Sequence, residues 1–86
     1  MKTFKDLEFK PHAMGEGIHS KLSFDNGYGV SVVRTSWTYG GKDGLYELAV
    51  LDEHGNLTYN TSVTNDVIGY LSEEEVSNVM EQVQKL

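Results

Sequence analysis

The chain has 86 residues, a net charge of −6 and no cysteine. This length predicts one domain over residues 1–86, and the lack of cysteine excludes disulfides and thiolate metal sites as supports for its small core. Stability then depends on burial, or on self-association as a homodimer. The acidic charge disfavours direct binding to nucleic acid or to an anionic membrane surface, because both carry negative charge themselves.

The first segment of the chain, residues 1–17, carries mixed signals and could be loosely ordered. Thr3 followed by Asp6 is typical of a cap on one helical turn, whereas Leu7 and Phe9 alternate as in a strand. The segment has no apolar run of signal-peptide length, and no later run approaches the roughly 18 apolar residues of a membrane span. We therefore expect a cytoplasmic protein.

Alternation of apolar and polar residues begins at Ile18 and predicts the first strand. It ends at Asp25-Asn26-Gly27, a hairpin signal because Asn and Gly tolerate the positive φ of a type I′ turn. A second strand is predicted over 28–36, with apolar residues on both faces as in a central strand. The glycines and charges of the following connection, 37–44, place it in solvent.

The third predicted strand covers 45–52 and is also apolar on both faces. After a turn at 53–56, alternation predicts a fourth strand over 57–61. The short apolar piece 67–71 fits either a fifth strand or a turn of helix. The predicted order is a simple meander.

The clearest local signal is a helix from Glu73 to about Lys85. Ser72 and Glu75 form a capping box, and Leu71 with Val76 occupies the positions of a hydrophobic staple. An apolar stripe follows at helical spacing, made of Val76, Val79, Met80, Val83 and Leu86. The predicted fold class is α+β: a four- to five-stranded antiparallel meander with one C-terminal amphipathic helix packed on one face.

No residue pattern indicates catalysis. His12 and His19 could approach each other across the glycine loop at 12–17 and recruit Glu16, but their spacing matches no known metal motif. No serine lies in a nucleophile elbow. We expect no enzyme activity, metal or cofactor.

Two features could be functional or structural. Glu47 lies in the middle of a strand, and we favour a structural ion pair with Arg34 or Lys42 over an acid/base role. The stretch Gly40 to Gly44 has the ingredients of an anion-binding nest, although it matches no phosphate-binding loop and reads more simply as a flexible connection.

Two surfaces are candidates for binding a partner. Tyr28, Trp37, Tyr39 and Tyr46 gather around the strand connections with Arg34, which is a composition typical of binding surfaces. The helix has an acidic outer face that could meet a basic partner. The candidate partner-binding residues are Arg34, Trp37, Tyr39 and Lys42 near the connection, and Glu73, Glu74, Asn78 and Glu81 on the helix.

Three stretches together, 26–32, 44–51 and 66–71 before the capped helix, resemble small uncharacterised proteins of tailed bacteriophages and prophages. The resemblance is one of layout over roughly residues 20–86 and carries over no functional residue. It implies an accessory factor that binds a host protein, as inhibitors of CRISPR and other defence systems do.

The leading functional hypothesis is therefore a non-enzymatic protein that binds, and could inhibit, a host protein by steric blocking or by acidic mimicry of nucleic acid. The alternative is an oligomer that binds a nucleotide or metabolite through Lys42, Arg34, the glycine loop and stacked aromatic rings.

Overall fold

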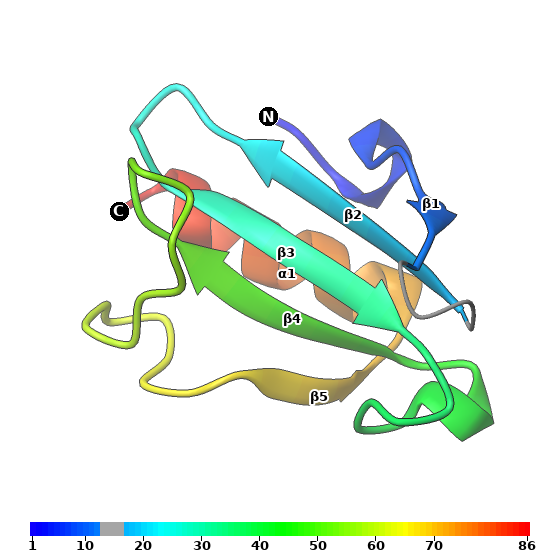
Figure 1. Ribbon diagram of the computed structural model, residues 1–86. Coiled ribbons are helices and arrows are strands. Elements are labelled where there is room, and N and C mark those ends of the chain that lie inside the picture. The colour runs from blue at the N-terminus through cyan, green and yellow to red at the C-terminus, as the bar shows by residue number, and fades with distance from the viewer. Residues whose placement is uncertain (13–16) are drawn as a thin grey trace.

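The computed structural model describes residues 1–12 and 17–86. Five strands form one antiparallel sheet in the order β1-β2-β3-β4-β5, and the helix α1 crosses one face of it (Figure 1). The elements are η1 Phe4–Asp6, β1 Lys10–Pro11, β2 Ile18–Ser23, β3 Gly29–Arg34, η2 Gly41–Asp43, β4 Tyr46–Leu51, β5 Ile68–Leu71 and α1 Glu73–Gln84, where η denotes a 3-10 turn. The predicted α+β class and meander order are confirmed.

The core lies between α1 and the sheet face that it covers. Val30, Val32 and Leu48 on the two central strands are 0% exposed, and so are Val76, Met80 and Val83 on the helix. Alternation along β3 and β4 therefore sends every second side chain toward the apolar stripe of α1. Leu86 was predicted to continue this stripe, but α1 ends at Gln84 and Leu86 is 37% exposed.

The start of α1 forms as its local sequence predicts. The Glu75 backbone N–H donates to Ser72 Oγ over 3.1 Å, and the Ser72 N–H donates to Glu75 Oε1 over 3.0 Å. These bonds to Ser72 lower the pKa of the Glu75 carboxyl, because they favour its charged form. Leu71 and Val76 are both buried, as expected for a hydrophobic staple.

The predicted fourth strand, 57–61, is wrong. Leu57 makes only an isolated bridge with Leu51, and β5 takes the place beside β4. The physical reason is burial: Leu57 and Tyr59 are 51% and 44% exposed, whereas Leu71 in β5 is 6% exposed. Pairing β5 with β4 therefore buries more apolar area than pairing residues 57–61 with β4 would. Of the two structures predicted for 67–71, a strand or a turn of helix, the strand is correct.

The hairpin at residues 25–27 is confirmed, but its predicted type I′ geometry is wrong. Gly27 has φ 91°, while among the described non-glycine residues only Tyr70 has a positive φ. Type I′ needs two consecutive positive φ values. The Asn26 side chain instead donates to the Val83 carbonyl over 2.9 Å and accepts from the Tyr28 N–H over 3.1 Å, so the turn is tied to the end of α1.

The first twelve residues contact the rest of the fold through backbone hydrogen bonds. The Phe4 N–H donates to Ser77 Oγ over 2.9 Å, and the Lys2 N–H donates to Gln84 Oε1 over 2.8 Å. β1 pairs with β2 and completes the sheet. Residues 13–16 of the predicted loop lie outside the described part of the chain. Within residues 1–12 and 17–86, no helix is both long and apolar enough to cross a membrane.

Candidate functional site

The connection between β3 and β4 folds back onto β5 instead of projecting into solvent. The Tyr70 N–H donates to the Tyr39 carbonyl over 3.1 Å, which joins the connection to the outer edge of the strand. Gly69 permits this approach, since a Cβ there would lie 2.4 Å from the Cβ of Tyr39. The connection and the end of β5 therefore form one surface at the same end of the sheet (Figure 1).

Three exposed aromatic residues belong to this connection and to β5. Trp37 is 82% exposed, and Tyr39 and Tyr70 are each 60% exposed. The rings of Tyr39 and Tyr70 are stacked, with centroids 6.4 Å apart and planes inclined by 27°. We call Trp37, Tyr39 and Tyr70 the aromatic patch. Beside it is an open hollow of about 210 Å³ lined by Ser36, Thr38, Tyr39, Gly40, Lys42, Asp43 and Tyr70.

Tyr70 adopts a strained backbone conformation, with φ 58°. The left-handed region costs an L-residue about 1–2 kcal/mol, and strain of this kind gathers at functional sites. The hydrogen bond to Tyr39 and the burial of the neighbouring Leu71 hold this conformation in place. The fold thus contains a strained backbone at Tyr70 together with an exposed Tyr70 ring.

The other aromatic residues of the predicted patch belong to the core. Tyr46 is 5% exposed, and its ring centroid lies 5.2 Å from that of Phe4 and 5.5 Å from that of Phe9. Arg34 is engaged with the same ring: its Nη1 donates to the Tyr46 hydroxyl over 3.2 Å, and its guanidinium carbon lies 5.0 Å from the ring centroid. Tyr28 is half-buried against the core.

Glu47 lies in β4, and its predicted ion pair with Arg34 or Lys42 is wrong. Among residues 1–12 and 17–86, no ion pair involves Glu47. Burial raises the pKa of the Glu47 carboxyl. The nearby Tyr39 backbone N–H partly offsets this rise in pKa because it favours the charged form, and the charge of Asp66 adds to the rise. Glu47 is thus a partly buried carboxyl with no ion-pair partner among the described residues.

We expect Glu47→Gln to remove a pH dependence of stability. Because the folded-state pKa is above the ordinary value of 4.5, the native chain binds more protons in that window, and stability falls as the pH rises through it. The amide that replaces the carboxyl carries no charge and therefore has no such desolvation cost. Urea unfolding from pH 4 to 7 measures this. The free energy of unfolding of the variant should rise relative to that of the parent as the pH rises, by less than about 1 kcal/mol because solvent screens the charge. A growing advantage of the parent would contradict this.

The stretch Gly40 to Gly44 is a closed turn and not an open anion nest. The backbone N–H groups of Asp43 and Leu45 both donate to the Gly40 carbonyl, over 3.0 Å each, and the N–H of Gly44 donates to Gly41. These donors are therefore already used. Lys42 is left exposed at the rim of the hollow.

The predicted acidic face of α1 is exposed along its length and is partly neutralised. Glu73, Glu74 and Asn78 are open to solvent, as is Glu81. Glu81 Oε1 lies 3.3 Å from Lys85 Nζ one turn further on. This face remains a second candidate contact surface, with a smaller charge than the sequence alone indicates.

The two histidines predicted to approach each other do so. The rings of His12 and His19 meet edge to face with centroids 5.5 Å apart. Glu16, the carboxylate predicted to join them, lies outside the described residues. Over residues 1–12 and 17–86, no three His, Asp or Glu side chains are grouped so that they could hold a metal ion.

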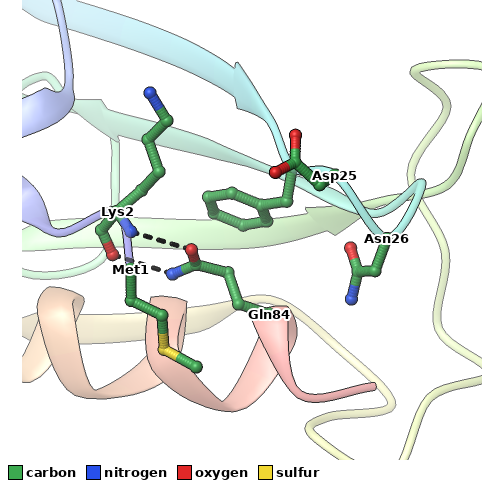
Figure 2. Close-up of a pocket in the computed structure, with 6 residues that line it drawn as sticks. Met1, Lys2, Asp25, Asn26 and Gln84 are labelled. Carbon is green, nitrogen blue, oxygen red and sulfur yellow. Dashed lines mark hydrogen bonds between the residues drawn. The ribbon is translucent and has the colours of Figure 1, made fainter.

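Another hollow, of about 350 Å³, lies where the chain ends meet the first hairpin (Figure 2). It is lined by Met1, Lys2, Phe24, Asp25, Asn26 and Gln84. Figure 2 shows Lys2 and Gln84 already bonded to each other across one side of it. Neither Arg34 nor Lys42, the cations predicted for a small-ligand site, lines this hollow.

Comparisons of the chain with protein-family models, curated proteins and solved structures found no match.

Proposed function

We propose that this chain is a non-enzymatic binding protein that acts in the cytoplasm and uses the aromatic patch to occupy the surface of another protein. The observation that carries the proposal is the pairing of Tyr39 with Tyr70. Two tyrosines from different elements stack at the surface, each 60% exposed, and one of them has a strained backbone. Exposed Trp and Tyr are the residues that most often dominate binding energy at protein interfaces.

The aromatic patch is favoured over the acidic face of α1 for two physical reasons. Its backbone is tied to β5 by the bond from the Tyr70 N–H to the Tyr39 carbonyl, so little backbone entropy is lost on binding. Exposed carboxylates on a helix, by contrast, are screened by salt, and Glu81 is already paired with Lys85. Acidic mimicry of nucleic acid is therefore the weaker version of the proposal.

The mechanism is steric. A partner that packs on Trp37, Tyr39 and Tyr70 has its own surface covered by a rigid sheet end, which prevents other molecules from using it. A phage accessory factor that inhibits a host defence protein would work in this way. The net charge of −6 would speed association with a basic partner and not determine its affinity.

The test is affinity capture from bacterial lysates with the tagged chain and matched variants. We expect one stoichiometric protein to be retained by the parent and by Tyr59→Ala, which removes a 44% exposed tyrosine outside the patch. Trp37→Ala should weaken capture by about thirtyfold, the value of a hot-spot residue. Salt should elute little of the partner.

Two results would refute the patch as the contact surface. One is capture that survives Trp37→Ala but is lost in the double variant Glu74→Lys, Glu81→Lys and on raising the salt, which would move the contact to α1. The other is equal capture by Trp37→Ala and Tyr59→Ala.

A further inference from the structure

The turn between β2 and β3 contains a reactive pair of residues. Of the asparagines in the chain, only Asn26 is followed by a glycine. Asparagine is a thermolabile residue, because the backbone nitrogen of the next residue can attack its side-chain amide. Glycine has no Cβ to hinder this approach. The pair Asn26-Gly27 is therefore the place in this sequence where the attack is chemically easiest.

The reaction, deamidation, needs only water as a co-reactant. The Gly27 backbone nitrogen bonds to the side-chain carbonyl carbon of Asn26, and the bond from that carbon to the amide nitrogen breaks. The proton of the Gly27 N–H leaves with the amide nitrogen as ammonia, and a succinimide ring remains. Water then opens the ring at one carbonyl to give aspartate or at the other to give isoaspartate. A neutral amide thus becomes a carboxylate at neutral pH.

The Asn26 side chain is held by hydrogen bonds at both its nitrogen and its oxygen. The amide nitrogen donates to the Val83 carbonyl over 2.9 Å and to the Leu86 carbonyl over 3.4 Å. The amide oxygen accepts from the Tyr28 N–H over 3.1 Å. Figure 2 shows Asn26 beside Asp25 in this turn. The amide must leave the carbonyl groups at the end of α1 before it can turn toward Gly27.

The attacking nitrogen is engaged as well. The Gly27 N–H donates to the Phe24 carbonyl over 3.1 Å, which closes the turn. Helix ends open locally at a lower free energy than the whole fold unfolds. Opening of the last turn of α1 is therefore the event that frees Asn26 to react, without unfolding of the sheet.

The product cannot restore the lost bonds. A carboxylate has no N–H to donate, and it would lie at the negative end of the α1 dipole. It would also follow Asp25 directly and share a hollow of about 270 Å³ with Asp52 and Glu53. These charges repel one another, so the converted turn is held less firmly against α1.

We propose that Asn26 is a spontaneous deamidation site controlled by the end of α1. The site is protected while the last turn of α1 is closed and reacts when that turn opens. The resulting carboxylate then keeps the turn between β2 and β3 detached from the helix.

Peptide mass spectrometry of the full chain measures the rate of conversion at Asn26. In native buffer this rate should be at least about tenfold lower than in a urea concentration that unfolds the chain. Gln82→Gly, in the last turn of α1, should raise the native rate about threefold to fivefold, because glycine weakens a helix locally. Glu74→Gly, in the first turn, is the matched control and should react close to the parent rate. Both replaced side chains are exposed.

Asn26→Asp reproduces one product of the reaction. It should lower the melting temperature by about 4–8 °C, because bonds to the end of α1 are lost and a charge is added there. Asn60→Asp makes the same change at another exposed residue and should melt close to the parent.

Three results would overturn the proposal. Equal rates of conversion at Asn26 in native buffer and in urea would show that the fold gives no protection. Equal acceleration by Gln82→Gly and Glu74→Gly would show that the whole chain must unfold before Asn26 reacts. Equal melting temperatures of Asn26→Asp and the parent would show that the product leaves the end of α1 unchanged.

Discussion

Replacing Met80 by aspartate is expected to leave the chain unfolded at 25 °C. Met80 is 0% exposed on the apolar stripe of α1. Losing a buried methionine costs about 2–5 kcal/mol, and placing a carboxyl group in the same apolar site adds several more. A chain of 86 residues has a total free energy of unfolding of only about 4–13 kcal/mol. The loss is therefore comparable to the whole stability.

The measurement is circular dichroism with thermal and urea unfolding, and Asn78→Asp is the matched control. This change places the same side chain on the exposed face of the same helix, so it should unfold close to the parent. A cooperative transition for Met80→Asp within a few degrees of the parent would mean that α1 does not pack on the sheet through Met80.

Replacing Gly69 by alanine is expected to detach the aromatic patch from β5. The new Cβ would lie 2.4 Å from Tyr39 Cβ and 3.3 Å from its Cγ, so Tyr39 must move. The 3.1 Å bond from the Tyr70 N–H to the Tyr39 carbonyl would then break. We expect a stability loss of about 1–3 kcal/mol and a fall in partner affinity of about thirtyfold or more.

Gly44→Ala serves as the control for this prediction. Gly44 lies at the end of the same connection with φ 76°, and a Cβ there would meet no atom within 4 Å. Its cost is backbone strain alone, about 1–2 kcal/mol, and partner affinity should be kept. Equal affinity of Gly69→Ala and Gly44→Ala in calorimetric titration would show that the docking of Tyr39 on β5 does not matter for binding.

The elements predicted well from the sequence are those whose signals are local. The Ser72 and Glu75 capping box and the Val76 to Val83 stripe define α1 without reference to any other segment. Alternation likewise predicts β2 and β3. β5 is harder to predict, because Gly69 and the left-handed Tyr70 interrupt its pattern. Only the burial of Leu71 beside the helix start decides its pairing with β4.

The sequence predicts some residues of the candidate site but not all of them. Trp37 and Tyr39 are singled out by composition, but Tyr70 contacts Tyr39 across 31 positions of the chain, and no local pattern encodes this contact. For Arg34 a signal did exist. It follows Val30 and Val32 at steps of two, so alternation alone places it on the face that α1 covers.

The bond between Lys2 and Gln84 joins residues 82 positions apart, and this has a consequence for the order of assembly. Hairpins such as β2–β3 close short loops and can form early. Lys2, by contrast, cannot form its bond until Gln84 has been synthesised. At about 5–20 residues per second, synthesis takes about 4–16 s to reach that partner. During this time Phe4 and Leu7 have no helix to pack against. The newly made chain therefore exposes the Phe4 and Leu7 side chains until α1 has emerged from the ribosome.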